Sequence, residues 1–210
     1  MGSRKEHHFL AQFYQKNFSV DQEDIYISFY NVNTGLYLKQ APISGQAKSK
    51  YLYGKDDVME SKLEKLEGAC SKIIRSIIDD NRLPSDYADL HLLGKFILYQ
   101  QARTVQHSKI MNEAFGSLNQ SMFGDVAPDD EMTVREMLEL MEQRLPYLAH
   151  LDYTLVINDT PVPFITSDNP VVLYNRMMEI KRHTTPGAWA NMGLPNPLSS
   201  KTPQSVMSTS

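Results

Sequence analysis

The first helix of the chain is predicted by apolar residues that recur every three or four positions after Asp57. A 3.6-residue period places them on one face, where they form the stripe Leu63, Leu66, Cys70, Ile73, Ile74 and Ile77. Asp56 or Asp57 can cap the start of the helix, and Glu60 stands at the position where a capping box needs an acid. We expect this helix to end near Asn81, before Pro84.

Two further helices follow from the same periodicity. One begins at about Asp86 and continues without a break to about Leu118. The other begins at Thr133, which has Glu136 three residues later in the spacing of a capping box, and ends near Leu145. The three helices are expected to form a central bundle.

Strands are predicted on both sides of these helices. Ile25–Val32 and Leu36–Leu38 are rich in aromatic and β-branched residues, and the polar turn 33–35 between them predicts a hairpin. The same pattern returns at Tyr153–Ile157 and Phe164–Thr166, so a second hairpin is expected there. Strands, then helices, then strands predict an α+β fold rather than alternating α/β units.

The domain organisation is expected to be simple. Residues 6–180 should form a single α+β domain. Residues 187–210 are rich in Pro, Asn, Ser and Thr and have little periodicity, which predicts a flexible tail.

Composition and charge narrow the function classes. The net charge is -4, and no run of Lys or Arg forms the basic face that is typical of a nucleic-acid binder. No apolar stretch approaches the roughly 20 residues of a membrane span, and no signal-peptide pattern follows Met1, so a cytoplasmic location is expected. Cys70 is the single cysteine; among apolar neighbours on a helix it is predicted to be a buried structural thiol.

Asp168 is the first candidate for chemistry, because it follows a predicted strand within Ser167-Asp168-Asn169-Pro170. A carboxylate at a strand end could bind a divalent metal ion, and Asn169 beside it could contact a ligand. The alternative is a turn, because Asp and Asn side chains fold back on nearby N–H groups and proline fixes the chain. Both interpretations stay open.

Histidine and glutamate supply further candidates. His8 has a side chain suited to acid–base work or metal ligation near neutral pH, although a purely structural histidine is equally plausible. Glu60 and Glu67 are seven residues apart and therefore share a helix face, with Glu64 close by. They are either solvated surface charges or a pair of carboxylates that faces a cleft.

Arg103 and Gln101 interrupt an apolar stretch of the second predicted helix, and buried polar groups must find partners. Arg103 could hold Glu67 or Asp168 structurally, or it could bind a phosphate or carboxylate with two hydrogen bonds. No phosphate-binding glycine-rich loop, nucleophile elbow or His-Glu-x-x-His zinc motif is present in the sequence.

The chain resembles the domain of unknown function 4238 family, an uncharacterised bacterial and phage family. Four blocks carry the resemblance in the same order: residues 8–18, 59–67, 101–104 and 164–171. Ala11 and Gln15 depart from the family pattern, and the end of the chain looks shortened. The resemblance places the family's recurrent polar positions at His8, Gln12, Glu60, Glu67, Arg103 and Asp168, and we expect their side chains to converge in one pocket.

Two functions are consistent with these residues. The first is a metal-assisted hydrolase, such as a nuclease or phosphoesterase. In it, His8, Glu60, Glu67, Arg103 and Asp168 are catalytic, Asp168 and Glu67 bind a divalent metal ion, and Gln12, Gln101 and Asn169 contact the ligand. The alternative is a non-catalytic module that binds a protein partner or a small ligand in a prophage or defence setting, with the polar cluster purely structural. The aromatic residues Phe9, Phe13, Tyr14 and Phe18 would then be either its binding surface or part of the core.

Overall fold

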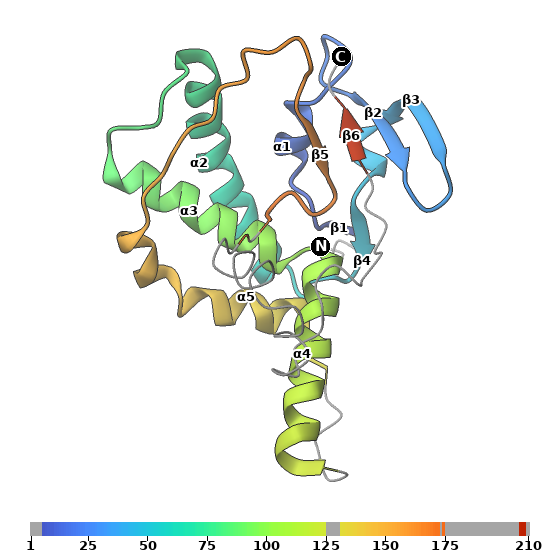
Figure 1. The fold of residues 1–210 in the computed structure, drawn as a ribbon, viewed down its shortest axis with the longest axis vertical. Helices are drawn as coiled ribbons and strands as arrows, with labels where there is room; N and C mark the ends of the chain where they lie inside the picture. The colour runs from blue at the N-terminus through green and yellow to red at the C-terminus, as the bar shows by residue number, and fades with distance from the viewer. Residues whose placement is uncertain (1–5, 125–130, 173, 175–205, 209–210) are drawn as a thin grey trace, which may run out of the picture.

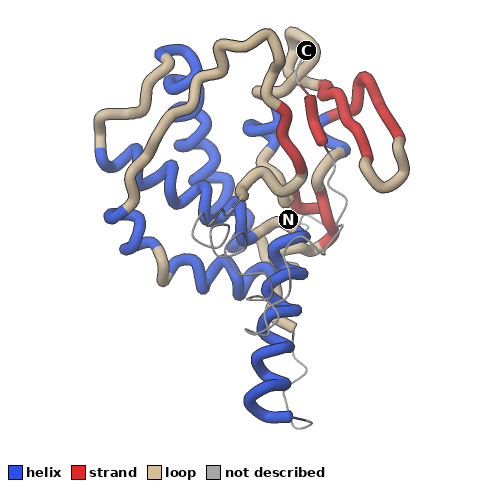
Figure 2. Tube along the Cα trace, viewed as in Figure 1, coloured by secondary structure: helices blue, strands red, loops and turns tan. Residues whose placement is uncertain are grey.

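The computed structural model describes residues 6–124, 131–172, 174 and 206–208. Helices gather on one side of the molecule and strands on the other (Figure 1 and Figure 2). The short helix α1 (Gln12–Lys16) contacts both the long helix α2 (Val58–Asp80) and strand β2 (Tyr26–Asn31). The predicted α+β class is confirmed.

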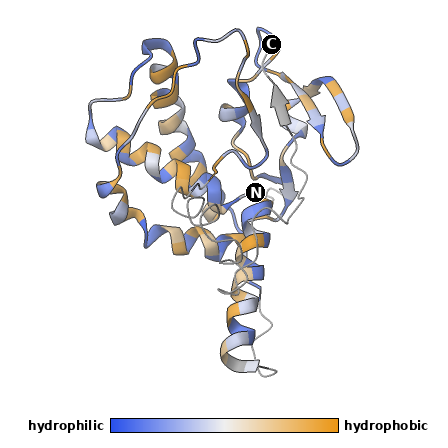
Figure 3. Cartoon of the chain, viewed as in Figure 1, coloured by the Kyte–Doolittle hydropathy of each residue, from blue (hydrophilic) through white to orange (hydrophobic). Residues whose placement is uncertain are grey.

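The main core lies where α3 (Tyr87–Ala102) packs against α2 and against α5 (Val134–Glu142). Apolar and polar residues alternate along α2 and α5 (Figure 3), as the periodicity of the sequence predicts. Cys70 belongs to this core and is fully buried, so the prediction of a structural thiol is confirmed. The other buried members are Ala11, Tyr53, Met59, Leu63, Leu66, Phe96, Tyr99, Ala102, Val134, Met137, Leu138 and Met141.

The predicted ends of two helices are also found. α2 begins directly after Asp57 and stops at Asn81, which adopts the left-handed conformation with φ of 51°. α5 begins with the complete capping box, in which the Thr133 hydroxyl accepts from the Glu136 N–H and the Glu136 carboxylate accepts from the Thr133 N–H. A 3-10 helix (Leu145–His150) follows α5.

The long second helix is not continuous, which corrects the prediction from the sequence. α3 ends at Ala102, and α4 (Val105–Phe123) starts anew and extends away from the rest of the molecule (Figure 1). The break falls at Thr104, which has extended backbone angles and whose hydroxyl accepts from the His107 N–H at 3.3 Å. A threonine that caps a new helix interrupts the old one without a glycine or proline.

The first predicted hairpin is confirmed as β2 and β3 (Leu36–Pro42). The Asn31 side chain accepts from two N–H groups in the turn, and Gly35 takes a φ of 68° that suits glycine. The inner face of the hairpin packs on a second core cluster made of Leu10, Ile27, Ala41 and Ile43.

The second predicted hairpin is wrong. Tyr153–Ile157 forms no strand, and β5 (Ile165–Ser167) pairs instead with β6 (Val206–Ser208), which also pairs with β2. The sheet order is β3-β2-β6-β5. The physical reason lies at Tyr153, whose side chain packs against Gly94 of α3 and so keeps this segment on the helices.

The predicted tail, residues 187–210, lies largely outside the described residues. Within it, only 206–208 are described, and they form β6. No helix in the described part of the chain has both the length and the apolarity that crossing a bilayer requires.

The N-terminal strand β1 (Glu6–His8) pairs antiparallel with β4 (Lys48–Lys50). β4 follows the short 3-10 helix Ile43–Gly45. Neither strand is predicted from the sequence, because three residues are too few to show an alternating pattern. This pairing fixes the chain just before α1 and so positions the N-terminal wall of the site.

Candidate functional site

A pocket of about 430 Å³ opens where the N-terminal segment meets α2 and the C-terminal end of α3. Polar and charged side chains form most of its lining. Its lining residues are Glu6, His8, Gln12, Glu60, Leu63, Glu64, Glu67 and Arg103.

Strand β1 supplies the first wall of the pocket. Successive side chains of a strand point to opposite faces, so Glu6 and His8 share the face that lines the pocket. His7 points the other way, is fully buried, and stacks on the Tyr53 ring with centroids 5.2 Å apart. The alternation along β1 therefore places His7 in the core and the adjacent His8 in the pocket.

Helix α2 supplies the opposite wall. Glu60, Leu63, Glu64 and Glu67 follow the i, i+3, i+4, i+7 spacing of one helix face. Glu60 and Glu67 are half-buried, whereas Glu64 is exposed. The sequence spacing alone predicts that Glu60 and Glu67 share a face, and the pocket gives that face a cavity to line.

The hydrogen bonds of His8 define its protonation state. Its Nδ1 lies 3.1 Å from the Gln46 carbonyl oxygen, which can only accept, so Nδ1 carries the proton. Nε2 then keeps its lone pair and accepts from the Gln12 side-chain amide at 2.6 Å. Burial lowers the pKa of His8 below its ordinary value. The imidazole is therefore neutral near pH 7, with a basic nitrogen on the pocket side.

Arg103 forms the floor of the pocket and is only 2% exposed. Its guanidinium pairs with Glu67 Oε1 at 2.5 Å and donates through Nε to Gln100 Oε1 at 3.0 Å. Its second terminal nitrogen donates to the same Gln100 oxygen. Neighbouring Tyr53 and Glu67 raise the pKa of Arg103, although burial opposes the charge. The guanidinium is therefore held by protein partners.

Tyr53 continues this buried network toward His8. Its hydroxyl donates to the His8 backbone carbonyl at 2.8 Å, and burial raises the pKa of the phenol. Gln100 donates to the Phe9 carbonyl at 2.8 Å. The backbone that carries His8 is thus fixed from below by two buried side chains.

The lining carries more negative than positive charge. Four carboxylates, from Glu6, Glu60, Glu64 and Glu67, face one guanidinium and one neutral imidazole. Lys48 offsets Glu6 with an ion pair at 2.7 Å, and Arg103 offsets Glu67. A pocket of this charge favours cationic groups and hydrogen-bond donors over phosphates.

Five of the six recurrent polar positions line the one pocket: His8, Gln12, Glu60, Glu67 and Arg103. They come from β1, α1, α2 and the C-terminal end of α3, as far as 95 positions apart in the sequence. Asp168 does not line it, and neither do Gln101 or Asn169.

Asp168 lies half-buried in the turn that follows β5. The Asn169 N–H donates to the Ser167 hydroxyl at 3.2 Å, and that hydroxyl lies 3.0 Å from the Asn169 carbonyl oxygen. The Thr104 hydroxyl lies 3.3 Å from Asn169 Oδ1, which joins the turn to the start of α4. These contacts have the character of the turn that the sequence offered as the alternative.

Gln101 contributes to the same junction with its backbone. Its side chain is buried, and its carbonyl accepts from the Thr104 hydroxyl at 3.0 Å. Among the described residues, no group of three or more His, Cys, Asp and Glu side chains is arranged to hold a metal ion. Glu67 and Asp168 in particular do not share the pocket.

Sequence reasoning missed part of the lining. Glu6 was not recognised, because its place beside His8 depends on the strand β1, which has no sequence signal. Leu63 was assigned only to the core, yet it also faces the pocket. Glu64 was noted beside Glu60 and Glu67 without a role, and its i+4 spacing from Glu60 was the signal that could have placed it.

Comparison with known proteins gives one result. The family model described as "Protein of unknown function (DUF4238)" matches residues 6–202, which include every residue of the pocket. Searches of curated proteins and of solved structures gave no significant match.

Proposed function

The chain belongs to the DUF4238 family of proteins of unknown function, and we propose that its pocket is a hydrolytic active site in which His8 is the general base. The observation that carries this proposal is the contact between His8 Nδ1 and the Gln46 carbonyl oxygen. A base must present an unprotonated nitrogen to its substrate, and a partner on the other ring nitrogen is the usual means of fixing that tautomer.

The proposed step begins with a water molecule that takes the place of the Gln12 amide at His8 Nε2. His8 removes a proton from this water, and the hydroxide forms a bond to the electrophilic carbon of the substrate. When the bond to the leaving group breaks, the imidazolium returns its proton to the leaving group, so the imidazole is regenerated. The displaced Gln12 amide can donate to the developing oxyanion.

The carboxylates of α2 have two roles in this proposal. Glu67 favours the imidazolium that forms during the step, because its negative charge acts on His8 and an opposite charge nearby favours the charged form of a histidine. The four carboxylates of the lining together favour a substrate that carries a cationic or hydroxyl group. We therefore favour carboxylic esters and amides over phosphoesters.

Of the two roles that the sequence left open for Arg103, we favour the structural one. Its guanidinium is nearly inaccessible and is held by Glu67 and Gln100, so it is poorly placed to bind a phosphate or carboxylate of a substrate. We propose that Arg103 and Glu67 hold the walls of the pocket together. Asp168, outside the pocket, is not part of the proposed site.

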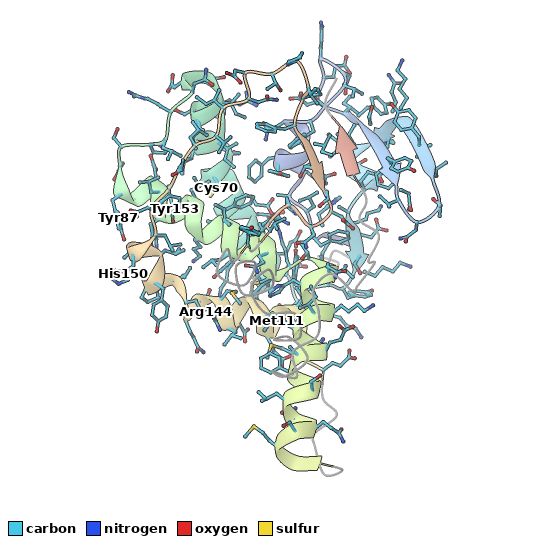
Figure 4. The ribbon with its side chains drawn as sticks, viewed as in Figure 1. Cys70, Tyr87, Met111, Arg144, His150 and Tyr153 are labelled. Atoms are coloured by element: carbon cyan, nitrogen blue, oxygen red, sulfur yellow. The ribbon has the colours of Figure 1, made fainter. Side chains whose placement is uncertain are left out.

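Hydrolysis of chromogenic substrates tests this proposal. The panel pairs p-nitrophenyl esters and p-nitroanilides that carry a free amino group with the same compounds acylated at that group, and it includes p-nitrophenyl phosphate. We expect hydrolysis of members with the free amino group and a loss of roughly 100-fold or more in kcat in His8→Gln. His150→Gln is the matched control, because His150 is exposed at the outer edge of the helical half (Figure 4).

Two outcomes would contradict the proposal. One is a wild-type protein that hydrolyses none of the carboxylic esters or amides. The other is a His8→Gln variant that is folded and as active as His150→Gln. Hydrolysis of p-nitrophenyl phosphate alone would contradict the substrate preference that we derive from the charge of the lining.

The second candidate function is a non-catalytic binding module. The observation that favours it is that each nitrogen of the Arg103 guanidinium donates to Glu67 or to Gln100, as expected for an arginine in a structural polar cluster. The aromatic residues considered from the sequence as its binding surface are half-buried against the two cores, so they are poorly placed for this role: Phe9, Phe13, Tyr14 and Phe18. Tyr30 and Tyr37, paired across the β2–β3 hairpin, are exposed instead. Both tyrosines can be replaced by Ser. If the double variant hydrolyses substrates like the parent but no longer binds a partner that the parent binds, the binding module is favoured.

A further inference from the structure

Gln100 uses both ends of its side chain in the interior of the protein. It is 2% exposed, although it lies in an otherwise apolar stretch of α3. Its Oε1 accepts from the Ala11 N–H at 3.3 Å and from Arg103 Nε at 3.0 Å, while its Nε2 donates to the Phe9 carbonyl at 2.8 Å. A buried amide that makes this many hydrogen bonds fixes the positions of the groups bonded to it.

The backbone that Gln100 holds lies between His8 and Gln12, which both line the pocket. Phe9 and Ala11 stand directly after His8 and directly before Gln12. The partners are 89 and 91 positions apart in sequence, so the contacts set how the N-terminal segment lies on α3.

Other contacts complete the attachment of this segment. The Tyr53 hydroxyl donates to the His8 carbonyl at 2.8 Å, and the Phe9 N–H donates to the Ala47 carbonyl at 2.9 Å. Gln100 and Tyr53 both also contact Arg103, and Gln100 does so through its Oε1. A continuous path of hydrogen bonds therefore runs from the backbone beside His8, through Gln100 and Arg103, to Glu67 on the opposite wall.

We propose that Gln100 is a positioning residue of the pocket, which sets the place of the His8 imidazole relative to the glutamates of α2. This inference rests on the proposed function in that His8 is the group whose position matters. Gln100 itself does not line the pocket, so it acts through the backbone and through Arg103.

A merely structural role makes a different prediction. If Gln100 only satisfied buried polar groups, its replacement would lower the melting temperature and leave the surroundings of His8 unchanged. If it positions His8, replacement loosens the segment, admits water to the imidazole and relieves the burial that lowers the pKa of His8. The pKa of His8 would then rise toward that of an exposed histidine.

The experiment is a proton NMR titration of the histidines in the full chain, with His8 assigned by its absence from the spectrum of His8→Gln. Two variants are compared with the parent. Gln100→Met removes every polar contact of the side chain. Gln100→Asn keeps a neutral amide but is one methylene shorter, so it cannot keep all of the contacts with Phe9, Ala11 and Arg103. Lys48, Glu67 and Arg103 are charged groups that act on His8, and neither variant removes one of them or adds a charge.

We expect the pKa of His8 to rise in Gln100→Met, and to rise by a smaller amount in Gln100→Asn. Met137→Ala is the control for lost stability, because Met137 is buried in the core on α5 and does not line the pocket. It should lower the melting temperature without changing the His8 titration. If Gln100→Met does not fold, Gln100→Asn carries the test.

An unchanged His8 titration in every Gln100 variant that folds would overturn the proposal. The titration needs no substrate, so its outcome is separate from that of the proposed function. If His8→Gln keeps full hydrolytic activity while the Gln100 variants shift the titration, the function fails and the positioning role stands. If His8→Gln loses activity and the titration does not move, the function stands and the positioning role fails.

Discussion

Two groups of polar residues meet at Glu67, and solvent reaches only one of them. In the buried network, Gln100 and Arg103 are each 2% exposed and their polar groups contact other protein groups. In the open pocket, His8 and Glu60 are half-buried and face a cavity of about 430 Å³. Glu67 and Arg103 belong to both, because both line the pocket and they pair with each other.

This difference teaches that residue type does not determine the role of a polar side chain in this protein. Arginine and glutamine are common in binding sites, yet here they fasten α3 to the N-terminal segment and to α2. A charge that is desolvated and fully paired is costly to disturb and offers little to a ligand. A half-exposed imidazole whose lone pair accepts from the Gln12 side-chain amide can exchange that partner for another.

The largest effect is expected from removal of Arg103. Arg103→Met should lower the free energy of unfolding by about 3 kcal/mol, because it leaves Glu67 and Gln100 without their buried partner. Arg135→Met is the matched control: Arg135 pairs with Asp56 at 2.6 Å, but the pair is exposed, so its loss should change stability little. Urea denaturation of both variants measures the difference.

Equal losses in the two variants would contradict the distinction between the buried network and an ordinary surface ion pair. If Arg103→Met loses little stability but loses hydrolysis, Arg103 takes part in the chemistry of the pocket rather than in the buried network. The comparison of the two groups would then have to be redrawn at Arg103.

A smaller effect is expected where a buried polar atom lacks a partner. The Tyr153 hydroxyl is buried, has no hydrogen-bond partner in the described part of the chain, and lies 2.3 Å from the position that a Cβ on Gly94 would occupy. Gly94→Ala should therefore cost about 1–3 kcal/mol of stability through overpacking. Tyr153→Phe removes the clashing oxygen, so it should be tolerated alone and should restore much of the loss in the double variant.

Failure of Tyr153→Phe to relieve Gly94→Ala would show that the clash comes from elsewhere, namely from Leu148, whose methyl groups lie 3.2 Å from the same position. Figure 4 labels Tyr153 beside the helical half, where this contact is made. Urea denaturation of the two single variants and the double variant supplies the full cycle.

Much of the fold could be predicted because its signals are local. The stripe of α2, its left-handed end at Asn81 and the turn before Gly35 each depend on residues within a few positions of one another. The break at Thr104 was missed, since a threonine inside an apolar pattern reads equally well as a helical residue. The partner of β5 was missed because it lies about 40 residues further along the chain.

The candidate site divides in the same way. The shared face of Glu60 and Glu67 followed from spacing, and the need of a buried arginine for a partner suggested Glu67 for Arg103, but His8 was joined to them only by the family resemblance. Glu6 had no signal, because its position depends on β1 pairing with β4 more than 40 residues away. Asp168 was the first candidate by local chemistry, and the hydrogen bonds of the turn in which it lies join its neighbours Ser167 and Asn169.

The pH dependence of stability should be moderate and should come from two half-buried histidines, one in the pocket and one on α4. Burial lowers the pKa of His8 and of His107, whose buried Nε2 has no hydrogen-bond partner among the described residues. The unfolded chain therefore binds protons at a pH where the folded protein does not. Stability is fully present above the ordinary histidine pKa of about 6.5 and is lost as pH falls through the lowered values.

Melting temperatures from about pH 8 to pH 5 measure this loss. His8→Gln and His107→Gln should each show a shallower decline than the parent, and the exposed His150→Gln should follow the parent. A decline that is equally steep in all three variants would show that other groups, and not these two buried imidazoles, are responsible.

The smallest effect is expected from metal ions, and it tests where the open pocket ends. Asp168 was predicted with Glu67 as a metal pair, but it lies in the turn at Ser167–Asn169 and outside the pocket. We therefore expect that any rise in melting temperature caused by Mg²⁺, Mn²⁺ or Zn²⁺ will be the same in the parent and in Asp168→Asn. Glu60→Gln is the matched variant within the pocket, so a shift that disappears there and survives in Asp168→Asn would assign ion binding to the glutamates of α2. A shift that disappears only in Asp168→Asn would instead extend the site to the turn after β5 and would remove the boundary between it and the pocket.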